Sequence, residues 1–438
     1  MAEARPVTHG RVLKIAVPIV LSNVTVPLLG AVDTGVVGQM GLAVPIGAVG
    51  LGAIILTSFY WIFSFLRMGT SGLAAQAHGA GDAAERTAVL LRAVLIGFLA
   101  GSLIALMQGP LFLLAFRLAP ASPEVEALAR SYLELRIWGA PATIALYAVT
   151  GWMIALERTK RVLVLNLWIT GVNVLLDLWF VLSLGLGVPG VALATLIAEW
   201  SGLGLGLWLC RDAFGPALEA AKARLSDGAA LRRMAAVNSD IMIRSVALQG
   251  SFTTFLFLGA SFGDVTLAAN QVLLQFLQIT AYALDGFAFA AEALVGQAVG
   301  ARSRPVLRRA VRLTLQWGIA GSIGLSLAFG IYGPAIIDLM TTAPDVRAAA
   351  RIYLWWLVAA PLLGVTGWMY DGVFIGATAT REMRNAMLLC VANYAVALAL
   401  LLPTLGNHGL WAALMLLNAT RGMVLARIWA RKEPTLTI

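Results

Sequence analysis

IAVPIVLSNVTVPLLGAVDTGVVGQMGLAVPIGAVGLGAIILTSFYWIFSFL, residues 15–66, contains one charged side chain, Asp33. A second apolar run, residues 162–198, also contains only one, Asp177. Such runs predict membrane-spanning helices, because about 20 apolar residues cross the hydrocarbon core of a bilayer. The composition agrees, since 60% of the residues are hydrophobic, 12% are charged and 44 are glycine. A soluble globular protein is therefore not expected.

Apolar stretches of this kind divide the whole chain. We count twelve, with a margin of one, centred near Leu28, Leu56, Ser102, Leu146, Val174, Gly204, Phe252, Tyr282, Gly321, Leu363, Ala395 and Leu416. The two halves repeat: QAHG at 76–79 matches QAVG at 297–300, and Pro141 matches Pro361. The prediction is an all-α polytopic membrane protein with two homologous six-helix lobes in parallel orientation. We expect an N-lobe at 1–215, a cytoplasmic linker at 216–233 and a C-lobe at 234–438.

The basic residues indicate the orientation in the membrane. Assigning the loops to alternate sides places 25 of the 31 Lys and Arg on the side of the amino terminus. The opposite side holds Arg117, Arg130, Arg136, Arg347 and Arg351. Because positively charged loops face the cytoplasm, both termini are predicted to be cytoplasmic. The net charge of +9 is then an orientation signal, and no nucleic-acid partner is expected.

The two isolated acids are the strongest indication of function. An ionisable group inside a membrane helix is costly, so it usually faces a wet cavity and marks an ion or substrate path. Distance along the helices places Asp33 and Asp177 at similar depth, where they can share one cavity. Asn173 lies one turn before Asp177 on the same helix face and can hydrogen-bond the carboxylate or a shared ion.

Two carboxylates in one cavity can exchange a proton for a cation. Deprotonated they attract a cation, and protonated they release it, so competition for the site couples two fluxes. This is a hypothesis of antiport. The alternative is that Asp33 hydrogen-bonds locally beside Thr34 and contributes to packing alone. Pro18 and Pro27 interrupt the first helix, either as hinges or as static kinks.

The second half has acids in a different arrangement. Asp371 is either a second ion site or a buried polar contact, and Glu292 lies in a span with few other charges. Asp240 and Arg244 are four residues apart and are expected to neutralise each other. Coupling is therefore expected in the first lobe.

Signatures of enzymes are missing from the sequence. It has no Walker-type glycine loop and no HExxH motif, and His9, His78 and His408 do not group as metal ligands. We expect no enzymatic activity, no metal site and no cofactor.

Four stretches carry a family resemblance: VDTGVVGQ from Val32, NSDIMIR from Asn238, DGFAFAAEALVGQAVGA from Asp285 and DGVFIGATATREMRN from Asp371. With them the chain resembles the multidrug and toxic compound extrusion (MATE) family, most closely its DinF branch. The resemblance implies a V-shaped pair of lobes in the bacterial inner membrane. It also implies export of organic cations and other amphipathic toxins in exchange for protons or sodium. We expect a monomer whose partners are the lipid bilayer, these substrates and the coupling ion.

The resemblance also assigns roles to single residues. Asp33 resembles the family's first-helix acid, and Pro18 falls where that helix is proposed to bend. Asn173, Asp177 and Thr195 match the hydrogen-bonded cluster around that acid, and Tyr132 is a further match, taken as a substrate-cleft residue. In the second lobe Asp371 matches an acid of sodium-linked relatives, whereas Asp240 is a poor match for their seventh-helix glutamate.

Three other functions remain as alternatives. A lipid-linked precursor flippase of the same superfamily would need several cavity arginines, and only Arg244 is a candidate. A membrane enzyme would need a clustered constellation of catalytic groups that the sequence lacks. A channel would need a filter-like loop, and none recurs in the repeats.

Overall fold

The computed structural model describes residues 5–39, 43–119 and 121–436. Within these ranges the regular secondary structure is helical, and eleven helices are long and apolar enough to cross a membrane. Each of the eleven contains one predicted centre, from Leu56 to Leu416. The remaining centre, Leu28, lies in α1 (His9–Gly38). The prediction of an all-α membrane protein is confirmed, with the number of spans inside its margin.

The chain forms two compact units, which we describe separately. The N-terminal unit comprises Leu21–His78 and Asp82–Arg232. The C-terminal unit comprises Arg233–Ile438 together with Gly79–Gly81 and the residues up to Val20, as far as they are described. The division within α1 therefore falls after Val20. The lobe boundaries expected at 215 and 234 remain a prediction.

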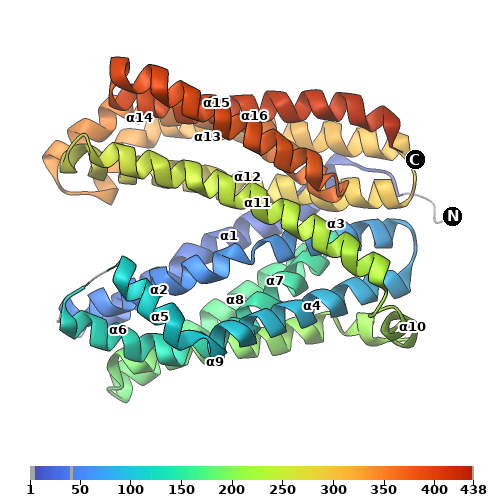
Figure 1. The fold of residues 1–438 in the computed structure, drawn as a ribbon, viewed down its shortest axis with the longest axis horizontal. Coiled ribbons are helices and arrows are strands. Elements are labelled where there is room, and N and C mark those ends of the chain that lie inside the picture. The colour runs from blue at the N-terminus through green and yellow to red at the C-terminus, as the bar shows by residue number, and fades with distance from the viewer. Residues whose placement is uncertain (1–4, 40–42, 120, 437–438) are drawn as a thin grey trace. The chain divides into compact units, whose positions relative to one another are not determined.

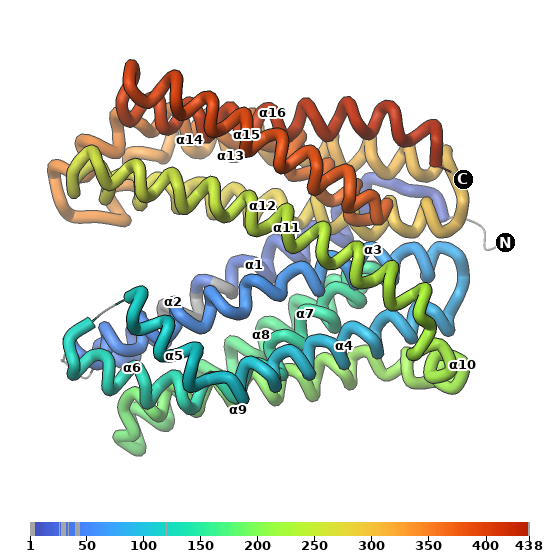
Figure 2. The backbone as a smooth tube through the Cα atoms, viewed as in Figure 1, coloured from blue at the N-terminus to red at the C-terminus, as the bar shows by residue number. Residues whose placement is uncertain are grey.

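The N-terminal unit is built from helices that pack in pairs: α4 lies along α7, α8 along α9, and α6 contacts both α2 and α9 (Figure 2). A Cβ added at Gly97 or Gly101 of α4 would collide with the backbone of α7. These glycines permit the close approach, as small residues do between membrane helices. After α1 the elements are α2 (Ala43–Ile62), α3 (Phe65–Gly79), α4 (Ala83–Leu106), α5 (Gln108–Leu118), α6 (Pro123–Arg136), η1 (Ile137–Gly139), α7 (Ala140–Ala155), α8 (Thr159–Asp177), η2 (Leu178–Ser183), α9 (Gly187–Leu209), η3 (Arg211–Phe214) and α10 (Leu218–Ala223).

The C-terminal unit contains longer, unbroken helices, and α14 packs against α12, α13 and α16 (Figure 1). Its core is apolar and aromatic, with the Phe255 ring edge-on to Trp411 at 4.6 Å between centroids. The Trp411 indole N–H donates to Asn270 at 2.9 Å inside this core. The elements are α11 (Gly228–Ala260), α12 (Asp264–Gly300), α13 (Arg304–Met340), α14 (Pro344–Gly376), α15 (Thr380–Leu405), α16 (Asn407–Lys432) and η4 (Glu433–Thr435).

The repeated prolines have different surroundings in the two units. Pro141 follows the short 3₁₀ turn η1, where the span breaks into α6 and α7. Pro361 lies inside the continuous α14. At this break a side chain at Gly139 would overlap the carboxylate of Glu199, so the backbone there passes close to a charged group.

Candidate functional site

The two isolated carboxylates meet at one amide. Asp33 on α1 and Asp177 at the end of α8 are 7% and 0% exposed. With its amide nitrogen turned toward them, Asn173 donates to Asp33 Oδ1 at 3.1 Å and to Asp177 Oδ2 at 3.2 Å. This is the amide orientation that satisfies both ends of the side chain, because its oxygen then accepts from Thr195 Oγ1 at 3.0 Å.

Local sequence spacing builds most of this cluster. Asn173 and Asp177 are four residues apart on α8 and so share a face. Thr195 comes from α9, which packs along α8. Directly after Asp177 the helix widens into the π-helical turn η2 (Leu178–Ser183), and such turns frequently occur at functional sites.

The carboxyl groups of Asp33 and Asp177 also hydrogen-bond to each other. Two ionised carboxylates are acceptors only, so this contact requires a proton on one of them. Apart from the contact with Asp33, the second oxygen of Asp177, Oδ1, is buried without a hydrogen-bond partner among the described residues. The cluster can therefore hold a proton between two acids and has acceptor capacity left for a cation.

A buried ion pair, which the sequence analysis missed, lies beside the carboxyl pair. Arg136 Nη1 donates to Glu199 Oε2 at 2.6 Å, and each residue is 8% exposed. The charge of Arg136 acts on both Asp33 and Asp177. Arg136 was counted among the basic residues of the opposite side, but it is buried within the helical stretch Pro123–Ala155 and does not lie in a loop. Glu199 directly follows the apolar run that contains Asp177, and that position was the available signal.

Tyr132 belongs to the same region of the N-terminal unit. It is 1% exposed, its hydroxyl accepts from Arg136 Nε at 3.4 Å, and its ring lies where a side chain at Gly52 would be. Glycine at 52 therefore makes room for the ring. Thr34, the partner in the local alternative for Asp33, lies outside the described side chains.

Asp371 and Asp240 of the C-terminal unit are each paired with an arginine. Arg244 Nη2 donates to Asp371 Oδ2. Asp240 does not neutralise Arg244, as its spacing suggested; it accepts from Arg384 Nη1 at 2.6 Å and from the Thr380 hydroxyl at 3.1 Å. Asp240 therefore pairs with residues of another helix, and not with the arginine four positions further along its own helix.

Two other charged residues of this unit are also buried. Glu292 is 1% exposed on α12. A further buried arginine, Arg421 on α16, is 3% exposed and was also missed.

The two prolines proposed as hinges lie on either side of the division within α1. Pro18 is buried and falls in the C-terminal unit, whereas Pro27 is exposed and falls in the N-terminal unit.

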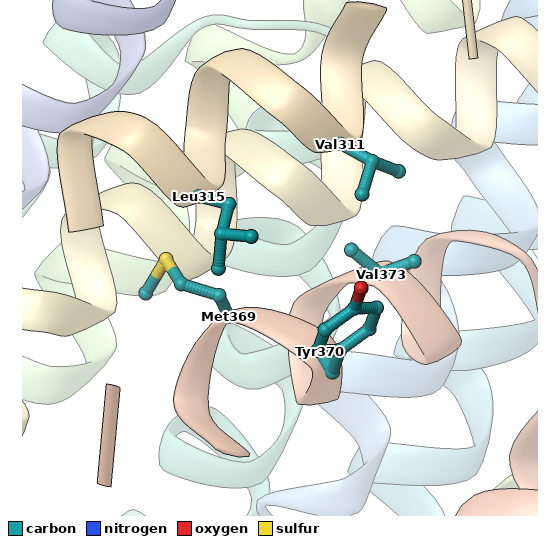
Figure 3. A pocket seen from close by; sticks show the side chains of 5 residues that line it. All are labelled: Val311, Leu315, Met369, Tyr370 and Val373. Carbon is teal, nitrogen blue, oxygen red and sulfur yellow. The ribbon is translucent and has the colours of Figure 1, made fainter. Parts of the chain in front are cut away.

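One small recess lies between α13 and α14 (Figure 3). It is a shallow, open depression with no room for a water molecule, and it is lined by apolar side chains and the ring of Tyr370. Its lining residues are Val311, Leu315, Met369, Tyr370 and Val373. Because none of these side chains carries a charge, the recess is not suited to an ion.

Comparison with known proteins gives consistent results. The family model MatE matches twice, at residues 18–179 and 241–401, which agrees with the internal repeat. DNA damage-inducible protein F of Escherichia coli (strain K12) is 40% identical over 420 residues, covering 95% of this chain and 91% of that protein. A Bradyrhizobium diazoefficiens protein named probable multidrug resistance protein NorM is 28% identical, over 82% of this chain and 78% of its own.

Solved structures have the same fold. A mutant of the Vibrio cholerae MATE transporter VcmN aligns with a TM-score of 0.89 at 19% identity, covering 98% of this chain and 97% of that one. An outward-facing multidrug resistance MATE family transporter of the MOP superfamily aligns at 0.86, also with 19% identity, covering 98% and 96%. The chain therefore belongs to the MATE family, whose members are membrane transporters and not enzymes.

Proposed function

We propose that this transporter is a secondary active antiporter that exports organic cations and amphipathic toxins in exchange for protons. The observation that carries the proposal is the single amide of Asn173 within 3.2 Å of two buried carboxylates. Such a cluster changes its charge when it takes up a proton, and a charged ligand then binds one state better than the other. The name of the multidrug-resistance relative agrees with this substrate range.

In this mechanism Asp33 and Asp177 are the exchanging groups, and Asn173 and Thr195 hold them in place. Sodium is the alternative coupling ion at the same cluster. Pro18 and Pro27 are the hinges of α1, where a missing backbone hydrogen bond makes bending less costly. We further propose a monomer in the bacterial inner membrane, with both termini cytoplasmic and lobes at 1–215 and 234–438.

The test is efflux of ethidium from proteoliposomes, driven separately by an imposed pH gradient and an imposed sodium gradient. Asp33→Asn and Asp177→Asn each remove one exchangeable proton with little change of shape. We expect each to reduce efflux driven by the pH gradient by about tenfold or more, which corresponds to about 1.4 kcal/mol. Asp345→Asn, at an exposed acid of α14, is the matched control and should behave as wild type. Unchanged efflux in both cluster variants would refute the assignment.

The flippase alternative gains one observation, because Arg421 joins Arg244 as a buried arginine. Transport of a lipid-linked pyrophosphate across the membrane of these proteoliposomes, together with no efflux of ethidium, would favour the flippase over the antiporter.

A further inference from the structure

Arg421 is buried without a complete set of hydrogen bonds. Its Nε and Nη2 have no hydrogen-bond partner among the described residues. The guanidinium lies against α14, where a Cβ added at Gly367 would be 2.7 Å from Nε and 3.2 Å from Nη2. It also lies 5.7 Å from the centre of the Trp368 ring. Burying a charge is costly unless the charge is paired and hydrogen-bonded, so this position requires an explanation.

Two other charged groups face the same place. Gly367 and Asp371 are one helical turn apart on α14, so the guanidinium lies beside the turn that carries Asp371. Asp371 is paired with Arg244 from α11, and Arg421 interacts electrostatically with both. The three helices thus bring together two positive charges and one negative charge. One positive charge remains uncompensated within the cluster.

The polar atoms of the cluster that lack hydrogen-bond partners indicate which kind of ligand it can bind. The donors are Arg244 Nε, Arg421 Nε and Nη2, and Nδ2 of Asn418, which lies one turn before Arg421 on α16. The only unsatisfied acceptor of these side chains is Asp371 Oδ1. Because buried polar groups are normally satisfied, a surplus of donors together with positive charge suits a ligand that accepts hydrogen bonds and is negatively charged.

We propose that Arg244, Arg421 and Asn418 form an anion-binding site in the C-terminal unit, for the carboxylate or sulfonate group of an organic substrate. Planar guanidinium groups match the two oxygens of a carboxylate. Asp371 then has a role other than holding sodium, because it is already paired with Arg244 and its negative charge weakens anion binding. This goes beyond exchange of cations, since it adds acidic or zwitterionic amphipaths to the substrate range.

The test measures binding to the full-length protein in lipid nanodiscs by scintillation proximity, with tritiated 1-naphthoate as the probe. Unlabelled 1-naphthylmethylammonium, which has a similar ring system and the opposite charge, is the competitor. We expect saturable binding of naphthoate that the ammonium compound does not displace. Arg421→Gln should weaken naphthoate binding by at least tenfold. Arg427→Gln removes an exposed positive charge from the same helix and should leave naphthoate binding unchanged.

A variant that binds naphthoate more tightly than the wild type cannot be explained by misfolding. Asp371→Asn removes the negative charge of the cluster and should tighten naphthoate binding several-fold, which loss of structure would not produce. Absence of saturable naphthoate binding to the wild type would overturn the proposal. Equal affinity of the wild type and Arg421→Gln, or no tightening in Asp371→Asn, would also overturn it.

One further variant separates this proposal from the antiport proposal. Asp33→Asn should reduce proton-driven efflux of ethidium by about tenfold or more while naphthoate binds as in the wild type. Either proposal can thus fail while the other stands.

Discussion

Arg136 and Glu199 form an ion pair of 2.6 Å inside the N-terminal unit, beside the carboxyl pair of Asp33 and Asp177. The pair joins the end of α6 to α9. Because each charge is largely removed from water, each depends on the other for compensation. The pair also supplies a positive charge close to the acids and a negative charge that offsets it.

Breaking this pair on one side should destabilise the protein strongly. Arg136→Gln leaves Glu199 buried and unpaired, at a cost of about 3–5 kcal/mol. The double variant Arg136→Met, Glu199→Leu leaves no unpaired charge and should recover most of the loss. Thermal unfolding in detergent, followed by tryptophan fluorescence, measures both variants. If the double variant is as unstable as the single one, the ion pair is not the cause.

Removing the amide that joins the acids should impair transport more than stability. Asn173→Leu keeps the volume but leaves the two carboxyl groups without their common donor, so we expect efflux driven by a pH gradient to fall by about tenfold. The control is Asn166→Leu, two turns earlier on α8, which loses a hydrogen bond of 2.6 Å to Ser22. The control should cost about 1 kcal/mol of stability and keep the efflux rate. Equal efflux in the two variants would argue against a role for Asn173.

The close approach of α4 and α7 predicts a sharp contrast between two glycines. In Gly101→Ala the new methyl group meets the backbone of Ala140 and Pro141, and overpacking of this kind costs about 1–3 kcal/mol or more. Gly204 on α9 is exposed with no atom within 4 Å of an added Cβ, so Gly204→Ala should be neutral or stabilise by up to about 1 kcal/mol. The melting temperatures of the two variants test this contrast: Gly101→Ala should melt well below the wild type and Gly204→Ala should not.

The loop after α9 contains an acid whose effect on stability should depend on pH. Asp212 accepts from Arg158 at 2.5 and 2.6 Å. Partial burial raises the pKa of Asp212, but the hydrogen bonds and charge of Arg158 outweigh it and the pKa lies below its usual value. Its stabilising contribution is therefore present above the unfolded-state pKa of about 3.9 and is lost as the pH falls through the lower folded-state value.

Asp212→Asn should accordingly lower the melting temperature slightly at pH 7, and the difference from wild type should shrink below about pH 4. Asp345→Asn, at an exposed acid of α14, controls for the change of net charge. A difference that stays constant between pH 7 and pH 3.5 would contradict this account.

The sequence predicts those features of the structure that depend on a single helix. Apolar runs locate the spans, and the spacing of Asn173 and Asp177 places both on one face. Similar depth along two helices suggests a shared cavity for Asp33 and Asp177, and in the structure both acids lie within hydrogen-bond distance of Asn173. Thr195 could be placed in the cluster only through the family resemblance.

Pairings between helices could not be predicted, because they depend on how each helix is rotated toward its neighbours. Arg136 looks like a loop residue when charges are counted along the chain, yet it is buried against Glu199. Asp240 and Arg244 look like partners along one helix, yet each is bound to a residue of another helix. Arg421 gives no signal in the sequence, because its burial depends on how α16 packs against α14.

That contact limits how this protein and its relatives can diverge. A Cβ at position 367 would lie 2.7 Å from Nε of Arg421, so a side chain there requires the guanidinium to shift or to be replaced. Across an alignment of homologues the two positions should therefore covary: arginine at 421 with glycine at 367, and larger residues at 367 only where 421 is small.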